Sequence, residues 1–164
     1  MRVSGFTLLE LMITIALVAV LASFAIPAFQ STVQNNRLLS CSNKLAAAVQ
    51  FAKSEAISTK QTILVESLLN PNGTPLYRVG SDDDSNNSVS DDELLQQLSC
   101  EGEGLAATNS LGASFISFGP TGFRNDGFGE VVFTTCNSLK KGKAFRVSIG
   151  GAVSSSDVPS GSCT

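Results

Sequence analysis

The chain has no histidine, and charged residues make up only 15% of its 164 residues. Histidine is the side chain that most often serves as a general base or a metal ligand, so an enzyme made from this chain would need carboxylates, lysines or cysteines instead. The net charge is −3, whereas general nucleic-acid binders present a basic face. We therefore expect a protein that is not an enzyme, that carries no cofactor and no metal, and that has one domain.

The four cysteines lack the close spacing of zinc and redox sites. They are Cys41, Cys100, Cys136 and Cys163, and no two of them form a C-x-x-C pair. An even number of widely spaced cysteines predicts disulfide bonds if the domain is exported to an oxidising compartment. The pairing stays open at this point, because four cysteines allow three connectivities.

Long apolar runs, by contrast, are present at the N-terminus. Residues Phe6–Phe29 are apolar apart from Glu10 and a few hydroxyl side chains, and the run is long enough to cross a bilayer as a helix. The short segment before it carries one charge, Arg2, which predicts by the positive-inside rule that everything after Phe29 faces outward. An ordinary secretory signal would have a shorter apolar run and an A-x-A-like cleavage site. The simplest interpretation is an N-terminal anchor for a periplasmic domain.

Two residues point beyond a plain anchor. Glu10 puts a carboxylate at the start of the apolar run, and a charge at the centre of a spanning helix costs about 2.5–3.5 kcal/mol and usually has a partner. Gly5 stands directly before Phe6, and the stretch GFTLLELMITIALVAVLASFAIPAF resembles the class III signal of type IV pilins and pseudopilins. Gly5, Phe6, Glu10 and Pro27 match the pattern of that family residue by residue.

The resemblance implies how the N-terminus is processed and used. A prepilin peptidase would cut after Gly5, the new N-terminal Phe6 would be N-methylated, and Glu10 would attract the N-terminal amine of a neighbouring subunit. The chain would then comprise a leader peptide at residues 1–5, a transmembrane half of the helix at 6–29 that later enters the filament core, and a periplasmic head domain at 30–164.

The helical pattern continues past the apolar run. Pro27 removes one backbone donor and is expected to kink the helix rather than end it, because apolar periodicity resumes beyond it. The apolar face of an amphipathic helix follows at three- and four-residue steps: Leu38, Cys41, Leu45, Val49, Ala52 and Ala56. The helical signal fades near Ser58–Gln61. We thus expect one long helix whose second half packs on the head.

The rest of the chain favours β-structure with frequent turns. The expected strands are Thr62–Ser67, Leu76–Gly80, Leu94–Cys100, Ser114–Gly119, Glu130–Cys136 and Ala144–Ile149. Several alternate apolar and polar residues, which is typical of antiparallel sheets with one face against a helix. The predicted fold class is α+β, the pilin fold, with turns at Asn70–Pro75 and Gly119–Gly129 and a polar tail after Val153.

Motifs in the head narrow the resemblance. The helix end FAKSEAIS at Phe51–Ser58, the stretch ISFGPTGFRNDGFGEVVFTTC at Ile116–Cys136 and the following AFRVSIGGAV are similar to the FimT/FimU/GspH group of minor pilins and pseudopilins. The resemblance implies a minor type IV pilin with two small sheets beside the helix, which helps to prime pilus assembly in a tip complex. Its partners would be major and minor pilins and the prepilin peptidase. It would cross the bacterial inner membrane once before entering the extracellular pilus.

Two alternative functions stay open. The H-type minor pseudopilin of type II secretion uses the same N-terminal signal. Some FimT-like pilins bind DNA through a Gly-Arg-x-Arg motif, but the matching stretch Gly151–Ser154 has neither arginine. A basic cluster nearby, Lys140, Lys141, Lys143 and Arg146, could supply a few weak phosphate contacts, although a solvated loop is the more ordinary interpretation. DNA is therefore not expected as a partner.

An acidic segment, DDDSNNSVSDDE, raises the hypothesis of a calcium site. Positions 1, 3, 5, 7 and 12 of an EF-hand-like loop would be Asp82, Asp84, Asn86, Ser88 and Glu93, with the apolar Val89 at the eighth. Asn87 stands where that loop needs glycine, and no helix precedes it. The alternative is a solvated hairpin tip rich in Asp, Asn and Ser.

The resemblance also gives the cysteines an oxidising compartment. Cys136 and Cys163 flank the last strand pair, so a bond between them would hold the tail on the sheet. Cys41 faces the head from the helix, and Cys100 is its remaining partner. Each closed loop is expected to add about 2–4 kcal/mol to the free energy of unfolding. The other two connectivities remain open on the sequence alone.

Overall fold

The computed structural model describes residues 7–69, 71, 73–100, 105–110, 114–159 and 163. This part of the chain forms one helix, α1 at Leu8–Thr59, followed by eight strands. The strands are β1 at Ile63–Leu69, β2 at Pro75–Ser81, β3 at Leu94–Ser99, β4 at Ala106–Asn109, β5 at Phe115–Phe118, β6 at Val131–Cys136, β7 at Gly142–Val147 and β8 at Val153–Val158. Two compact units, Met1–Val33 and Gln34–Thr164, divide the chain within α1.

In the first unit, the helix is apolar around its whole circumference. Thirteen large apolar side chains are exposed, namely Leu8, Leu9, Leu11, Met12, Ile13, Ile15, Leu17, Val18, Val20, Leu21, Phe24, Ile26 and Phe29. By length and composition, α1 is the one helix among the described residues that could cross a membrane. A helix that is apolar all round needs apolar surroundings on every side.

Four hydroxyl groups of this unit are satisfied within the helix itself. The hydroxyls of Thr14, Ser23 and Ser31 each donate a hydrogen bond to the carbonyl three residues earlier, and Thr32 donates to the carbonyl of Ala28. Lipid offers no partners for such groups, so internal satisfaction suits a spanning helix. The helix also continues through Pro27, as its sequence predicts.

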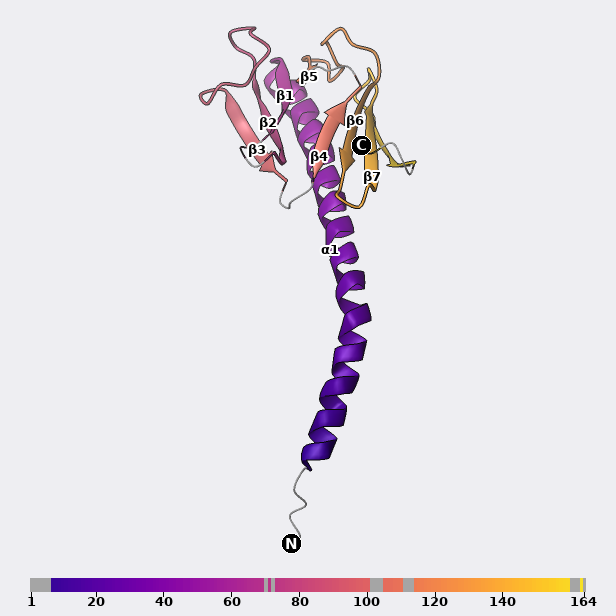
Figure 1. Cartoon of the computed structure of the whole chain (residues 1–164). Coiled ribbons are helices and arrows are strands. Elements are labelled where there is room, and N and C mark those ends of the chain that lie inside the picture. The colour runs from indigo at the N-terminus through magenta and orange to yellow at the C-terminus, as the bar shows by residue number, and fades with distance from the viewer. Residues whose placement is uncertain are drawn as a thin grey trace. The chain divides into compact units, whose positions relative to one another are not determined.

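The second unit packs two antiparallel sheets on the other half of α1. One sheet has the order β3-β2-β1-β5 and the other β4-β6-β7-β8. Figure 1 shows β1, β2 and β3 beside one flank of this part of α1 and β4, β6 and β7 beside the other. The core between them joins the helix face to Ile63, Val65, Tyr77, Val79, Ile116 and Phe118 of the first sheet and Val131, Phe133, Phe145 and Val147 of the second. The predicted α+β class, with a long helix packed on antiparallel sheets, is therefore confirmed.

The predicted helix face is confirmed as well. All six predicted positions from Leu38 to Ala56 are buried, and Ser42 and Ala48 join them. The helix ends at Thr59, inside the zone where its sequence signal fades. Six strands lie within two residues of their predicted bounds.

Two strands correct the sequence prediction. Strand β4 was not predicted at all, and the tail expected after Val153 is in fact the strand β8, which pairs with β7 from Val147↔Val153 to Gly142↔Val158. The sequence of β8 is VSSSDV, and its four central residues are exposed. Main-chain pairing with β7 does not require an apolar face, so the pattern search had nothing to detect in a polar edge strand.

Candidate assembly surfaces and the residues that build them

The first turn of α1 is closed by Thr7 and Glu10. The Glu10 carboxylate accepts hydrogen bonds from the backbone N–H and the hydroxyl of Thr7, at 3.0 and 2.9 Å, and the Glu10 N–H donates to the Thr7 hydroxyl at 3.2 Å. This reciprocal arrangement is a capping box, and it holds an anion where the helix dipole favours one. The contact between Thr7 and Glu10 was not predicted, although the T-x-x-E spacing signals it. Gly5 and Phe6 lie outside the described residues.

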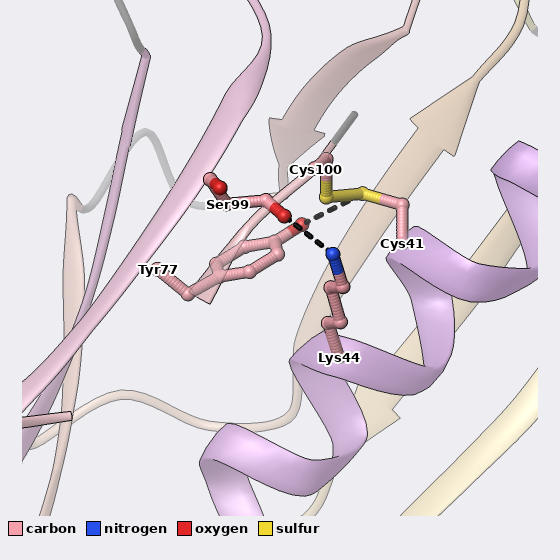
Figure 2. The surroundings of a disulfide bond; sticks show 5 residues. All are labelled: Cys41, Lys44, Tyr77, Ser99 and Cys100. Carbon is pink, nitrogen blue, oxygen red and sulfur yellow. Dashed lines mark hydrogen bonds between the residues drawn. A yellow bond between two sulfur atoms is a disulfide. The ribbon is translucent and has the colours of Figure 1, made fainter. Parts of the chain in front are cut away.

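One disulfide ties α1 to the first sheet. Cys41 and Cys100 are bonded with their Cα atoms 5.1 Å apart, and the Lys44 ammonium donates to the Ser99 carbonyl at 2.7 Å beside them. Figure 2 shows the Tyr77 hydroxyl pointing toward the Cys41 sulfur, 4.0 Å away. Tyr77 is buried, and this burial raises the pKa of its phenol, against a weaker lowering by Thr135. The disulfide is therefore a buried covalent link between α1 and the first sheet.

The other disulfide closes the C-terminal strand. Cys136 at the end of β6 is bonded to Cys163, with their Cα atoms 5.7 Å apart. The bond spans β7 and β8, so it holds the edge strand against its neighbour. No described cysteine is free. Of the three connectivities that the sequence left open, the structure contains Cys41–Cys100 and Cys136–Cys163.

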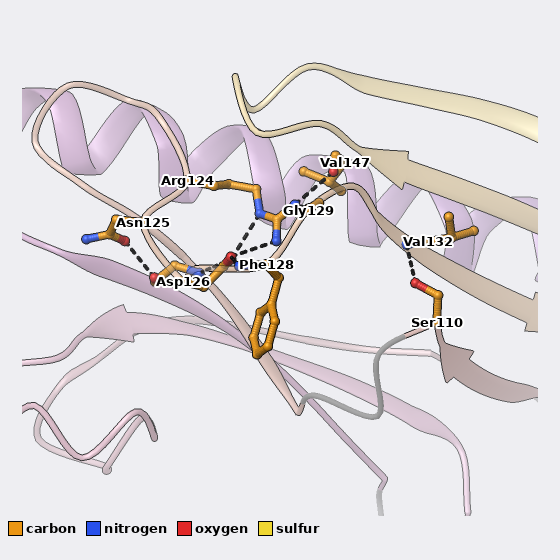
Figure 3. Close-up of polar contacts among 9 residues, drawn as sticks. Ser110, Arg124, Asn125, Asp126, Phe128, Gly129, Val132 and Val147 are labelled. Carbon is orange, nitrogen blue, oxygen red and sulfur yellow. Dashed lines mark hydrogen bonds and ion pairs between the residues drawn. The ribbon is translucent and has the colours of Figure 1, made fainter.

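A buried ion pair in the loop between β5 and β6 joins the two sheets. The side chains of Arg124 and Asp126 are both fully buried, and the guanidinium contacts the two carboxylate oxygens at 3.0 and 2.8 Å. Figure 3 shows the guanidinium also reaching Val147 in β7. It donates to the carbonyls of Val147 and Gly129 at 2.9 and 2.7 Å. The bidentate, charge-assisted pair and the two further hydrogen bonds from the guanidinium offset the cost of burying the two charges.

Asp126 connects the same pair to the first sheet. Its carboxylate accepts from the backbone N–H of Ser117 in β5 at 3.2 Å and from that of Phe128 at 3.0 Å. The neighbouring Asn125 accepts from the Ser117 hydroxyl at 2.6 Å. The sequence prediction treated Gly119–Gly129 only as a turn. An Arg and an Asp two residues apart in a loop give no burial signal, which is why the pair was missed.

The acidic loop, residues 82–93, is organised around Glu93. The Glu93 carboxylate accepts from the backbone N–H of Asp83 at 2.9 Å and of Ser90 at 3.0 Å, and from the Ser90 hydroxyl. The hydrogen bonds from Ser90 hold the pKa of Glu93 below its usual value. The Glu93 carboxylate therefore holds the two ends of the acidic loop together.

Other side-chain oxygens that the calcium hypothesis treats as ligands also accept hydrogen bonds from the backbone of the loop. Asp82 accepts from the Asn87 N–H, Asp84 from the Asn86 N–H and Asn86 from the Ser88 N–H, at 3.2, 3.2 and 2.7 Å. Among the described residues, no three His, Cys, Asp or Glu side chains gather as metal ligands would. The donor geometry supports the hairpin-tip alternative between β2 and β3.

The acidic loop also covers the outer face of the first sheet. Val89 is buried outside the main core. A Cβ at Gly80 would lie 2.5 Å from the Val89 side chain and 2.4 Å from the Glu93 carbonyl, so only glycine permits this close approach. Glu66, also buried, accepts from the Ser88 hydroxyl at 3.1 Å. The loop is a folded layer of the head.

The predicted basic cluster is divided in the structure. Lys140 and Lys141 are exposed at the turn between β6 and β7, whereas Lys143 pairs with Asp157 at 2.6 Å and Arg146 lies 3.9 Å from Glu130. Lys143 and Arg146 are three positions apart in β7 and therefore point to opposite faces. The stretch Gly151–Ser154 begins at the other end of β7, away from Lys140 and Lys141. These residues form no continuous basic surface.

The family described as Type II transport protein GspH matches residues 42–152, more than half of the chain. The chain belongs to the GspH family. Residues 1–26 match the prokaryotic N-terminal methylation motif, which covers the segment with Glu10 and its cap. The match to the GspH family covers most of the head, from Ser42 in α1 to the turn before β8.

Solved structures with the same fold come from pili and from type II secretion. The minor pilin FimU of Pseudomonas aeruginosa has a TM-score of 0.63 at 19% identity, over 79% of this chain and 98% of that chain. The minor pseudopilin EpsH of Vibrio cholerae has a TM-score of 0.55 at 12% identity, over 74% of this chain and 97% of that chain. These likenesses show that this GspH-family chain has the fold of the FimT/FimU/GspH group.

A sequence relative covers a shorter stretch. The type IV major alpha-pilin of Moraxella bovis is 37% identical over 62 residues. The match spans 38% of this chain and 39% of that pilin, so the two are alike over less than half of either length.

Proposed function

We propose that this GspH-family chain is a minor type IV pilin, a structural subunit that helps to prime pilus assembly in the tip complex, and that it is not an enzyme. The observation that carries the proposal is the exposed apolar helix of the first unit, attached to a head with its own core and two disulfides. A helix that is apolar all round is stable in lipid before assembly and among other apolar helices afterwards.

The proposal includes the processing and topology of the chain. A prepilin peptidase removes residues 1–5 by cutting between Gly5 and Phe6, and Phe6 is then N-methylated. Residues 6–29 cross the inner membrane once, and the head at 30–164 lies in the periplasm until assembly moves it to the extracellular pilus. Major and minor pilins are the partners. The methylation motif over residues 1–26 supports this order of events.

The alternative is an H-type minor pseudopilin of type II secretion. The GspH family and the likeness to EpsH support it. The pilus is supported by the matching stretch of a major pilin, by the likeness to FimU, and by the C-terminal strand that Cys136–Cys163 holds in place. We do not propose DNA capture, because Lys143 and Arg146 are engaged by carboxylates and both motif arginines are missing.

Deletion of the gene in its native strain separates these functions. The expected result is loss of surface pili with normal export of secreted enzymes, and recovery on complementation. Immunogold labelling of a tagged copy should mark pilus ends rather than the whole filament. Intact pili with failed enzyme export would replace the proposal by the pseudopilin alternative.

Mass spectrometry of the protein from sheared pili tests the processing. The mature chain should begin at N-methylated Phe6. A mature chain that begins at Met1, or beyond Pro27, would contradict assignment as a processed pilin subunit.

A further inference from the structure

One turn of the head combines exposed basic and apolar side chains. Residues 137–141 connect β6 to β7, and at the tip of this connection Leu139 is 44% exposed and Lys140 and Lys141 are both exposed. We call these three residues the basic turn. Apolar side chains beside lysines are typical of segments that bind at a membrane interface.

The conformation of the basic turn is fixed. The side chain of the buried Asn137 accepts hydrogen bonds from the backbone N–H groups of Leu139 and Lys141 at 3.1 and 3.0 Å, and its own N–H donates to the Lys141 carbonyl at 2.9 Å. Lys140 has a φ of 58°, in the left-handed region that favours glycine. Lysine is more strained there than glycine would be, which makes its side chain a candidate for a specific use.

Two hydrogen bonds hold the basic turn against α1. The Ser138 hydroxyl donates to the Gln34 side chain at 2.9 Å, and the Asn137 amide donates to that of Asn35 at 3.3 Å. Gln34 follows Phe29, the last residue of the apolar run, within the same helix. The step from 29 to 34 is about 7.5 Å at 1.5 Å per residue. The basic turn is therefore attached to α1 just after its apolar run ends.

This spacing matches the polar layer of a bilayer. The hydrocarbon core is about 30 Å thick and the whole bilayer about 40–45 Å, so each headgroup layer is about 5–7.5 Å thick. If residues 6–29 cross the membrane, as proposed above, the basic turn is attached at the outer edge of the headgroup layer. The flexible lysine stems can reach from there to the phosphates. The inference rests on the proposed topology to this extent.

The charge of the basic turn is positive and unpaired. Asp157 lines the same hollow between α1 and β7 as Lys141, but its carboxylate is paired with the Lys143 ammonium at 2.6 Å. Among the described residues, neither Lys140 nor Lys141 has an ion-pair partner. Arg37, which is exposed in the next turn of α1, adds a third cation at this level of the helix. Anionic headgroups are the complement of such a surface.

We propose that the basic turn is a membrane-contact site, which binds anionic phospholipid headgroups on the outer face of the membrane that holds the N-terminal helix. Leu139 enters the interface, and Lys140 and Lys141 pair with lipid phosphates. Two or three cations and one leucine would not recruit a soluble protein to a membrane. Here the helix keeps the basic turn beside the lipid, which raises its effective concentration there.

A weak contact suits a subunit that has to leave the lipid again. The contact determines which side of the head faces the membrane before assembly. It is given up when the subunit moves from the lipid into a filament, so a strong contact would oppose that step. The basic turn thus orients the head without holding the subunit back.

Tryptophan fluorescence tests the contact with the full-length protein, because the chain has no tryptophan of its own. Leu139→Trp places the probe in the basic turn. The matched control Ile149→Trp places it between β7 and β8, at a residue that is 58% exposed. The variants are reconstituted in phosphatidylcholine vesicles with or without about 30% phosphatidylglycerol, with a nitroxide on some of the headgroups. We expect quenching at position 139 to be at least about twofold stronger with phosphatidylglycerol, and quenching at position 149 to be weak in both lipids.

Charge removal tests which groups make the contact. Lys140→Gln with Lys141→Gln, added to Leu139→Trp, should lower the quenching to the level in phosphatidylcholine alone. Lys60→Gln with Arg146→Gln removes the same charge from other exposed positions of the head and should leave the quenching unchanged. Equal quenching in both lipids, or in both double variants, would show that the probe enters the interface without help from the lysines. Either result would overturn the proposal.

Carbonate extraction separates this inference from the proposed function. A chain that stays in the vesicles but shows no quenching at position 139 would overturn the head contact alone. A chain that carbonate releases from the vesicles would contradict the proposed membrane anchor, and the contact with it.

Discussion

The two halves of α1 are parts of one helix with different surfaces. Between Leu8 and Val33 no residue is buried, whereas the half from Gln34 to Thr59 has eight buried residues along one face. The first half is apolar on all sides, and the second is apolar only where the sheets pack. Regular helical structure alone therefore does not determine the surroundings that a helix needs. The angular spread of its apolar side chains determines them, so the first half needs lipid or other helices and the second needs the head.

If the two halves have separate tasks, Glu10 should affect assembly and leave the head intact. Glu10→Ala removes both the carboxylate and the capping box with Thr7. We expect normal membrane insertion and cleavage but a loss of about tenfold or more from sheared filaments, because an unpaired amine in an apolar core is costly. Fractionation of the native strain, with quantitative blotting, measures it.

Glu10→Gln is the matched control for this change. The amide can still accept from Thr7, but it carries no charge. If charge pairing with a neighbour is the task, both variants fail; if the cap alone matters, Glu10→Gln assembles. Native incorporation of Glu10→Ala would remove Glu10 as an assembly contact.

Substitution of Arg124 should have the opposite effect, because it should destabilise the head and leave the N-terminal half of the helix unchanged. Arg124→Met leaves the Asp126 carboxylate buried and uncompensated, which should lower the free energy of unfolding by about 3–5 kcal/mol. Denaturant unfolding of the detergent-solubilised chain measures this. Arg146→Met, at a half-exposed pair, should cost less than about 1 kcal/mol. Asp126→Asn added to Arg124→Met should recover part of the loss, and no recovery would mean that the uncompensated charge is not the cause.

The C-terminal disulfide should have a smaller and more local effect. Replacing Cys136 and Cys163 together by serine should lower the free energy of unfolding by about 2–4 kcal/mol. Hydrogen exchange should become faster in β8 and the facing part of β7, while β1 and β2 keep their protection. Uniform loss of protection across both sheets would show that the Cys136–Cys163 bond stabilises the whole head rather than its edge strand.

Glu93 should give the smallest effect, visible through pH. Its pKa is lower in the folded chain than the usual value of about 4.3, so its ionised form stabilises the fold above that pH. This contribution is lost as the pH falls through the lowered pKa. Glu93→Gln should therefore unfold more easily than the native chain at pH 7, with the difference shrinking below about pH 4. Asp92→Asn, at an exposed neighbour, is the matched control for removing one carboxylate from the same loop.

The sequence predicted those parts of the fold where periodicity and burial agree. Leu38, Leu45 and Val49 recur at helical spacing and are buried, and the alternation in Ile116 and Phe118 marks an inward strand face. Strand β8 was not predicted, because serines on both of its faces carry no such pattern. The Arg124–Asp126 pair was not predicted for a related reason. Its burial depends on contacts with Val147 and Ser117, which lie outside any local sequence window.

The candidate sites also differ in whether the local sequence reveals them. Glu10 could be singled out because a carboxylate is conspicuous in an apolar run, and its cap follows from a spacing of three residues. The exposure of Phe123 and Ile149 could not be predicted, because both look like ordinary core residues in the sequence. Their exposure depends on turns that bring Gly122 against Ile57 at the end of the helix.

If the chain is the pilus subunit proposed above, the Cys41–Cys100 bond has a further consequence when its N-terminal helix is pulled. Tension enters the head along α1, and without the bond it could draw out the chain between the two cysteines. That stretch covers a separation of 59 residues, which would lengthen by up to about 200 Å at 3.3–3.6 Å per residue. The covalent bond would carry the load past this stretch, so we expect β1, β2 and β3 to stay folded at forces that would separate them from a helix held by packing alone.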